Sequence, residues 1–185
     1  MASGHPPQRR PTSAELIDIF GLEPLPVEGG LLVQTWRSDE VVGTDDVDAG
    51  DKRAGTAAIA LLTDEPDSFS AVHRLPTTEV WHFYLGDPIQ MLLLRPDGTV
   101  ERPVLGPDVL AGQHVQVVVT PGTWMGARLA PCGGYGLFGC TMAPGFTSGD
   151  YEGGRAALAS DYPDAAAEIE TLIRPDAPTR MPSRP

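Results

Sequence analysis

Two side chains with acid–base chemistry lie six residues apart in the aromatic-rich stretch from residue 73 to residue 86. His73 brings an imidazole, whose ordinary pKa lies near neutrality, and Glu79 brings a carboxylate. If both point into the protein, they converge among aromatic rings. A carboxylate is costly to bury there unless it is paired or protonated. This stretch is therefore the first candidate for a functional site.

We expect this stretch to form a β-hairpin, with strands over residues 69–75 and 79–84 joined at residues 76–78. Side chains alternate along a strand, so one face of the second strand carries a carboxylate and two large rings: Glu79, Trp81 and Phe83. The opposite face carries His82, for which we expect a structural or interface role. His73 is predicted to share the Glu79 face.

Glu79 has three interpretations from the sequence. It orients His73, it is a second acid or base, or it is a buried carboxylate paired with Arg37 or Arg74. In the first case the carboxylate fixes the tautomer of the imidazole and raises its basicity, as proton transfer requires.

The elements that must position these residues are short strands separated by turn signals, a pattern typical of a β-sandwich or barrel. A short N-terminal helix is predicted, capped by Thr12 or Ser13 and ended by Gly21. A C-terminal helical segment covers residues 156–173, broken at Tyr162-Pro163. The predicted strands are 31–37, 57–62, 69–75, 79–84, 89–94, 100–104, 115–119, 124–129 and 135–143.

The 185 residues fit one domain with tails. We expect disordered tails over residues 1–12 and 175–185, a barrel over 13–152 and the helical segment over 153–174. The acidic loop from Ser38 to Gly55 is interpreted as a lid, a dimer contact or a disordered segment.

A formal net charge of -12 argues against nucleic acid or an anionic membrane surface as partner. We find no apolar run that could span a bilayer and no signal-peptide pattern, which predicts a cytoplasmic protein.

The two cysteines, Cys132 and Cys140, lack zinc-site spacing, and we expect buried thiols. Nucleophile-elbow, P-loop and dinucleotide motifs do not occur.

Three blocks of sequence together resemble one family. They are Glu15 to Ser38 with Gly21-Leu-Glu-Pro and Thr35-Trp-Arg-Ser, Phe69 to Pro88 with His73-Arg-Leu and Glu79-Val-Trp-His-Phe-Tyr, and Val117 to Phe146 with Gly122-Thr-Trp and Ala143-Pro-Gly-Phe. The chain resembles the cupin superfamily and, within it, the DUF985 or cupin-5 family. The resemblance implies an all-β double-stranded β-helix, or jelly-roll barrel, which is commonly a homodimer with a ligand site inside.

The resemblance also bears on metal binding. Many cupins hold a divalent metal with two His and a Glu from a first motif and one His from a second motif. His73 and Glu79 match two of these positions, while Leu75 and Met125 occupy the other two. A thioether is a poor ligand for hard divalent ions. We therefore expect no cofactor, with a divalent metal on His73 and Glu79 as the alternative.

The resulting hypothesis is a small-molecule enzyme of the epimerase, isomerase or dehydratase (lyase) type, with His73 as catalytic base or acid and Glu79 as its partner. Its substrate is expected to be sugar-like or carbonyl-bearing, by analogy with metal-free sugar epimerases of the superfamily. The alternatives are a metal-dependent dioxygenase or isomerase, and a non-catalytic small-molecule-binding barrel. The expected substrate-binding residues are Glu28, Thr35, Trp81, Phe83, Trp124, Met125 and Phe146.

Overall fold

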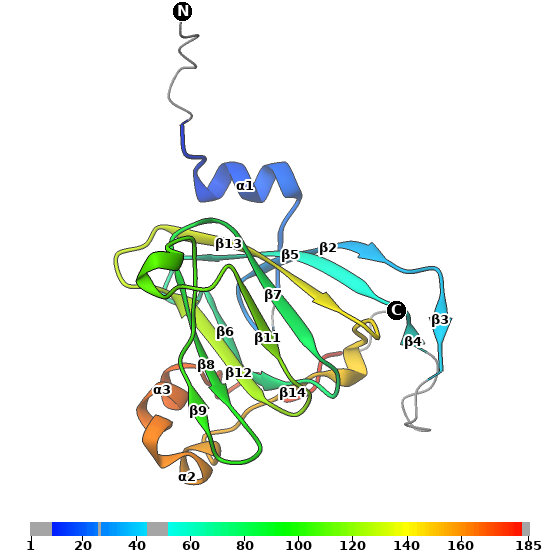
Figure 1. Cartoon of the computed structure of the whole chain (residues 1–185), viewed down its shortest axis with the longest axis vertical. Helices are drawn as coiled ribbons and strands as arrows, with labels where there is room; N and C mark the ends of the chain where they lie inside the picture. The colour runs from blue at the N-terminus through cyan, green and yellow to red at the C-terminus, as the bar shows by residue number, and fades with distance from the viewer. Residues whose placement is uncertain (1–8, 26, 44–51, 183–185) are drawn as a thin grey trace, which may run out of the picture.

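Two antiparallel β-sheets face each other in the computed structural model, which describes residues 9–25, 27–43 and 52–182. The first sheet has the strand order β1-β2-β5-β13-β7-β11 (Figure 1). Its strands are β1 (Glu23–Pro24), β2 (Leu31–Arg37), β5 (Thr56–Thr63), β13 (Tyr135–Met142), β7 (Glu79–Gly86) and β11 (Gln116–Val119).

The second sheet has the order β10-β8-β12-β6-β14, and β9 pairs with β8. Its strands are β10 (Val104–Leu105), β8 (Ile89–Leu94), β12 (Trp124–Leu129), β6 (Phe69–Arg74), β14 (Glu152–Gly153) and β9 (Val100–Glu101). A small third pair, β3 (Val41–Val42) with β4 (Lys52–Arg53), extends from one end of the first sheet (Figure 1).

The core lies between the two sheets and is apolar because alternate residues of both sheets point into it. Trp81 and Phe138 stack at its centre with ring centroids 4.6 Å apart and nearly parallel planes. The buried cluster comprises Ala60, Leu62, Leu75, Trp81, Ile89, Met91, Leu93, Leu105, Val117, Val119, Met125, Ala127, Phe138 and Met142. This arrangement is the predicted double-stranded β-helix.

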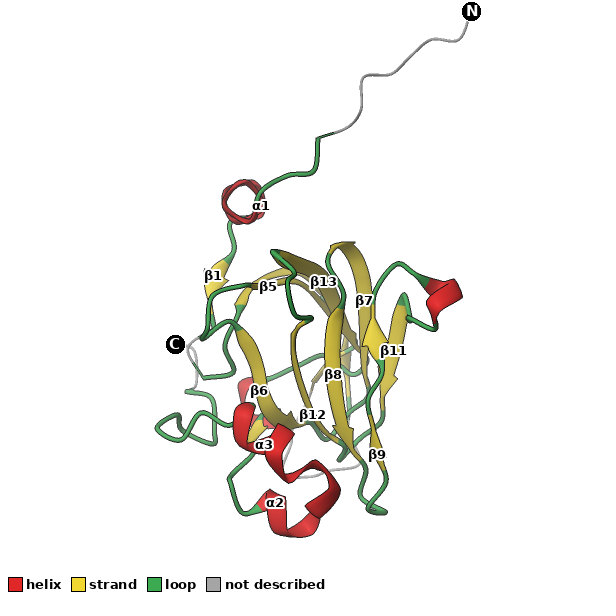
Figure 2. Ribbon diagram, turned by 90° about the vertical axis from the view of Figure 1, so that its left-hand side faces the viewer, coloured by secondary structure: helices red, strands yellow, loops and turns green. Residues whose placement is uncertain are grey.

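Helices cover the outer faces of both sheets (Figure 2). α1 (Ser13–Phe20) begins at a capping box between Thr12 and Glu15 and ends at Gly21, as predicted. Its Leu16 packs on the first sheet against Leu61 and Leu137. None of the helices in the described ranges is long and apolar enough to cross a membrane.

α2 (Leu158–Asp161) and α3 (Ala166–Thr171) pack on the outer face of the second sheet, against Phe69, Leu92 and Trp124. The helical segment predicted over residues 156–173 is therefore present. It is divided by a 3₁₀ turn, Pro163–Ala165, because proline cannot continue the hydrogen-bonding pattern of the preceding helix.

The predicted hairpin over residues 69–84 is wrong. β6 belongs to the second sheet and β7 to the first, so the chain passes from one sheet to the other between them instead of turning back on itself. β6 is buried on both faces along nearly its whole length, which suits a strand flanked by β12 and β14. His73 and Glu79 therefore approach the interior from opposite sheets.

The strand predicted over residues 100–104 is divided into β9 and β10 at Arg102 and Pro103, since proline has no N–H for the ladder.

Parts of the predicted tails make defined contacts. Arg9 pairs with Glu15 at 2.6 Å, and the carbonyl of Thr179 accepts the Gly153 N–H at 2.9 Å. Residues 1–8 and 183–185 lie outside the described residues, as does part of the predicted acidic loop, residues 44–51.

Candidate functional site

His73 lies in the middle of β6 and is almost completely buried, with 2% of its surface exposed. Its Nδ1 lies 2.8 Å from the carbonyl oxygen of Ala71. A carbonyl can only accept, so Nδ1 carries a proton and donates it. In the neutral ring Nε2 is then the unprotonated nitrogen. The ring of Tyr151 stacks on the imidazole with centroids 5.2 Å apart, which fixes the ring plane.

Glu28 supplies the carboxylate beside His73, with Oε1 3.9 Å from Nε2. It lies in the turn between β1 and β2, whose backbone is tied to β6 by a 2.8 Å hydrogen bond from Ala71 N–H to the Glu28 carbonyl. Gly29 allows this approach because its φ is +101° and a Cβ there would lie 2.3 Å from the Phe69 carbonyl. Glu28 keeps 18% of its side chain exposed, so this carboxylate is less deeply buried than the histidine beside it.

Ser70 also belongs to this cluster, and its hydroxyl donates to Oε1 of Glu28 at 2.7 Å. Ser70 and His73 are three residues apart, so regular alternation would place them on opposite faces. The pairing of β6 with β12 shifts register between Met125 and Ala127, and this irregularity brings both side chains to the same carboxylate. The sequence contains no signal for such a shift, and Ser70 was not predicted as a site residue.

Glu79 faces the same interior from the start of β7 and is 8% exposed. Its Oε2 accepts the indole N–H of Trp81 at 2.9 Å. Burial raises the pKa of Glu79 above its usual value, and the nearby charge of Glu28 raises it further. Attraction to His73 and hydrogen bonds from Trp81 and Cys140 oppose this shift without reversing it.

The expectation that Glu79 orients His73 is wrong, because the backbone carbonyl of Ala71 holds the ring. The alternative pairing of Glu79 with an arginine is also wrong. Arg74 binds Glu152 in a two-bond ion pair, with both distances 3.0 Å, and Arg37 lies exposed at the end of β2. Glu79 instead accepts from the indole of Trp81, two residues further along the same strand face, and from the thiol of Cys140.

Apart from Glu28, the predicted substrate-binding residues fall into two groups. Trp81, Phe83, Met125 and Phe146 belong to or pack against the interior cluster, and for Trp81 and Phe83 strand alternation indicated this. Trp124 precedes Met125 in β12 and therefore points outward, where it packs among the helices under the guanidinium of Arg74, 4.6 Å from the ring centroid. Thr35 is exposed at an irregularity of β2 and donates to the Ala57 carbonyl. Neither Trp124 nor Thr35 is a wall of the interior.

The residues at the usual metal-ligand positions do not fit a metal. Leu75 and Met125 are buried members of the apolar core. Among the described residues, no group of three or more His, Cys, Asp or Glu side chains is arranged to hold an ion. Thioether and alkyl groups cannot replace imidazoles for a hard divalent cation. We therefore interpret His73 and Glu79 as acid–base groups.

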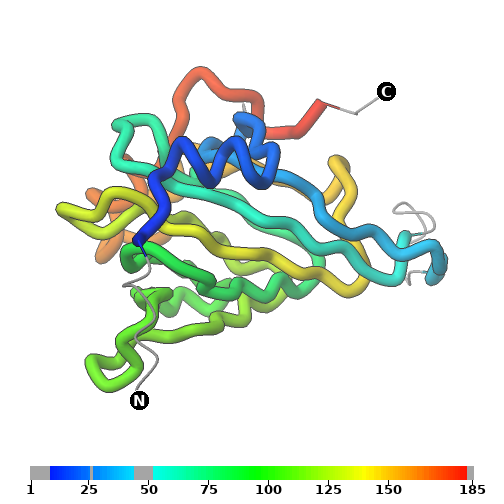
Figure 3. The backbone as a smooth tube through the Cα atoms, turned by 90° about the horizontal axis from the view of Figure 1, so that it is seen from above, coloured from blue at the N-terminus to red at the C-terminus, as the bar shows by residue number. Residues whose placement is uncertain are grey.

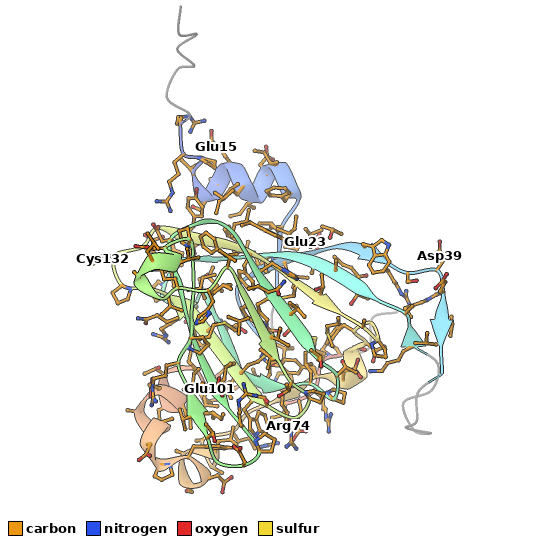
Figure 4. All side chains as sticks on the ribbon, in the orientation of Figure 1. Glu15, Glu23, Asp39, Arg74, Glu101 and Cys132 are labelled. Atoms are coloured by element: carbon orange, nitrogen blue, oxygen red, sulfur yellow. The ribbon has the colours of Figure 1, made fainter. Side chains whose placement is uncertain are left out.

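The two cysteines differ, and only part of the expectation for them holds. Cys132 is an exposed thiol on the loop between β12 and β13, and its own backbone has a positive φ of 64° (Figure 4). Cys140 is half-buried in β13, directly opposite Trp81. Burial and the carboxylates of Glu79 and Glu28 raise the pKa of Cys140, so its thiol stays protonated.

The fold and the interior cluster define a double-stranded β-helix of the cupin type. A family model described as "Cupin superfamily (DUF985)" matches residues 14–153, which is most of the chain. The chain therefore belongs to the DUF985 family of the cupin superfamily. No curated protein matches the sequence.

Two solved structures are similar along most of their length. A hypothetical protein from Leishmania major is 30% identical, with a TM-score of 0.79, and the match covers 88% of this chain and 99% of that one. A protein from Shewanella oneidensis is 28% identical, with a TM-score of 0.78, and the match covers 90% of this chain and 100% of that one.

Proposed function

We propose that this cupin is a small-molecule enzyme that moves a proton with His73 as the base and Glu79 as the acid. The observation that carries the proposal is the orientation of His73. Its Nδ1 proton is committed to the Ala71 carbonyl, so Nε2 has a free lone pair beside Glu28. An imidazole held in this way, with one ring nitrogen unprotonated, suits abstraction of a proton next to a carbonyl group.

Glu28 and Glu79 differ in ways that suit two roles. Glu28 is partly exposed and held by Ser70, and as a carboxylate it would stabilise the imidazolium that forms when Nε2 takes a proton. Glu79 is buried and its pKa is raised, which favours the protonated acid. Two carboxyl groups in such different environments, one partly exposed and one buried, are typical of acid–base catalysis.

The reaction class that fits is epimerisation, isomerisation or dehydration of a carbonyl-bearing or sugar-like molecule. In each case the first step breaks a C–H bond next to the carbonyl. The proton moves to Nε2 of His73, and the electron pair moves toward the carbonyl oxygen. A protonated Glu79 would donate a hydrogen bond or a proton at a second position of the substrate. The aromatic rings of Trp81 and Phe83 would limit access of water to the reacting atoms.

The experiment measures solvent exchange, which does not require the natural product to be known. The full chain is incubated in D₂O with a panel of aldehydo-sugars, keto-sugars and 2-oxo acids, and proton NMR follows deuterium incorporation next to the carbonyl. We expect exchange of at least one panel member. His73→Gln should slow it about 100-fold or more, as loss of a general base does.

His114→Gln is the matched control, because His114 is exposed and outside the interior cluster. It should leave the exchange rate unchanged. Exchange that persists in His73→Gln would overturn the role of His73. Ligands that bind and raise the melting temperature without any exchange would support the alternative, a non-catalytic small-molecule-binding barrel.

A further inference from the structure

The polar groups around His73 give the interior of the barrel a negative character. Glu28 accepts a 2.7 Å hydrogen bond from the neighbouring serine hydroxyl and keeps contact with solvent, which suits an ionised carboxylate. Besides burial, the charge of Glu28 raises the pKa of Glu79, Cys140 and Tyr151, which favours their protonated, uncharged forms. The interior therefore presents one anionic acceptor among neutral hydrogen-bonding groups.

The positively charged side chains of the chain are placed elsewhere. Of the 13 lysines and arginines, all except Arg184 lie within the described residues. Lys52 alone among these is buried, and its ammonium is paired with Asp150 at 2.5 Å. Other cations form ion pairs with carboxylates at the surface: Arg9, Arg10, Arg74, Arg95 and Arg102.

Arg174 approaches the turn that carries Glu28, but from the outside of the barrel. Its guanidinium lies over the ring of Phe69, 4.6 Å from the centroid, and donates to the Asp67 carbonyl. Phe69 belongs to the outer cluster beneath α2 and α3. The charge of Arg174 opposes the rise in the pKa of Tyr151 without reversing it. This guanidinium is therefore committed to contacts outside the interior.

The N-termini of helices, which commonly bind anions through their free backbone amides, also lie away from the interior. α1 crosses the outer face of the first sheet (Figure 3), and its first turn is satisfied by the capping box. α2 and α3 pack on the outer face of the second sheet. An anionic ligand in the interior would meet Glu28 without a compensating positive group, and the net charge of -12 would oppose its approach.

We propose that the interior selects an uncharged polyhydroxy aldehyde or ketone, a free sugar, and rejects the carboxylated and phosphorylated forms of the same molecule. This inference rests on the proposed function, because it names the substrate of the same site. Sugar hydroxyls would donate to Glu28 and share hydrogen bonds with Glu79, and Trp81 and Phe83 would contact the C–H groups. A cationic substrate fits less well, because Glu28 must pair with the imidazolium of His73 when the proton moves.

The test compares sugars that differ only at C6. Each of several free hexoses is measured beside its uronate, its 6-phosphate and its 6-amino-6-deoxy form. Saturation-transfer NMR on the full chain gives the Kd of each ligand and requires no turnover. We expect at least one free hexose to bind, with a Kd lower than that of its uronate and its phosphate by about 10-fold or more. The amino form should bind no more tightly than the free sugar.

Glu28→Gln tests the origin of this selectivity, because it removes the charge and keeps the shape of the side chain. The ratio of the uronate Kd to the free-sugar Kd should fall about 10-fold, toward equal binding. Glu170→Gln is the matched control, since it makes the same change in net charge at an exposed position of α3. The ratio should stay as in the natural protein.

Three results would overturn the proposal: a uronate or phosphate that binds as tightly as its free sugar, an amino form that binds more tightly, or a panel in which no free sugar binds. A ratio that Glu28→Gln leaves unchanged, in a variant with native circular dichroism, would also overturn it. Solvent exchange separates this failure from that of the proposed function. Free sugars that bind without exchange would uphold the selectivity and contradict the role of His73 as a base. Exchange confined to charged sugars would do the reverse.

Discussion

His73 and His82 lie nine residues apart on neighbouring segments, yet their surroundings are opposite in kind. His73 is buried between the sheets, uses Nδ1 on a backbone carbonyl and leaves Nε2 beside a carboxylate. His82 lies on the outer face of β7, and both of its ring nitrogens have neutral side-chain partners, Gln116 and Thr141. One imidazole keeps a nitrogen free for chemistry, while the other is fully used in holding adjacent strands together.

The difference follows from strand alternation and from which face is enclosed. On β7 the odd-numbered side chains Glu79 and Trp81 point inward, and the even-numbered His82 points outward. An inward polar group loses its water and must find a partner within the protein. An outward group can keep an ordinary environment. The residue type is the same in both histidines, and position alone separates their roles.

The largest expected effect is on the inner face of β7. Trp81→Ala removes a buried ring that stacks on Phe138 and holds Glu79, and should lower the free energy of unfolding by about 3–5 kcal/mol. Urea denaturation of both proteins measures the change. Leu110→Ala, at an exposed position, should cost less than about 0.5 kcal/mol. A cost for Trp81→Ala no larger than this control would mean that the interior is not packed as described.

The next effect concerns the charge of Glu79. Its pKa in the folded protein is raised, so the protonated form is favoured by folding. This contribution is present below the unfolded pKa, near 4.5, and is lost as the pH rises through the folded pKa. Glu79→Gln should remove that loss, so the variant gains stability relative to the natural protein as the pH rises, by up to about 1.4 kcal/mol per unit within this window. Unfolding free energies across the pH range provide the measurement.

Glu101 provides a control in which stability depends on pH with the opposite sign. Its bond to Arg95 lowers the pKa of Glu101, so the stabilisation is present above the usual pKa and is lost as the pH falls through the folded value. Glu101→Gln should therefore cost stability at neutral pH and not in acid. The cost should be small, because the pair is partly exposed to solvent. Equal pH dependence in both variants would contradict the assignment of Glu79 as the buried acid.

A smaller effect is expected at Ser70. Ser70→Ala removes the hydroxyl that donates to Glu28 and should cost about 1–2 kcal/mol, because the carboxylate loses a partly buried, charge-assisted hydrogen bond. Thr35→Ala removes an exposed hydroxyl that donates to a carbonyl and should cost less. Thermal denaturation at neutral pH ranks the two. If Thr35→Ala proved the more damaging, the Ser70–Glu28 contact would not stabilise the turn.

Much of the fold could be predicted from the sequence because its determinants are local. The capping box at Thr12, the alternation in β7 and the turn residues each act over a few positions. The pairing of β6 and β7 with other strands was missed, because the two predicted strands, 69–75 and 79–84, are separated by only three residues and resemble a hairpin. Choosing between a turn and a crossover depends on the partners β12, β13 and β14, which are distant in sequence.

The candidate site was predicted only in part, because local patterns identify some of its residues and the others depend on distant contacts. His73 and Glu79 stand out by residue type, and their inward direction follows from alternation. The contact between Glu28 and His73 depends on a turn that docks on β6 through backbone atoms, and the contribution of Ser70 depends on a register shift. Neither feature leaves a pattern in residue types. The outward position of Trp124 follows once its neighbour Met125 is known to point inward.

The smallest expected effect concerns the tautomers of His73 and His82. Measuring them is the most direct check of the comparison between the two histidines. In the neutral rings His73 should carry its proton on Nδ1, which donates to the Ala71 carbonyl. His82 should carry its proton on Nε2, because Nδ1 accepts from the Gln116 amide and Nε2 then donates to Thr141. Two-bond ¹⁵N–¹H correlation spectra at a pH above the histidine titrations distinguish the two forms.

The assignment of signals comes from His73→Gln and His82→Gln, each of which removes one ring. Gln116→Leu is a useful further variant, because it removes the donor to Nδ1 of His82 and should leave the His73 pattern unchanged. If both rings showed the Nε2-protonated form, the lone pair of His73 would face Ala71 and not Glu28. His73 could then not take up a proton at the position that the proposed reaction requires.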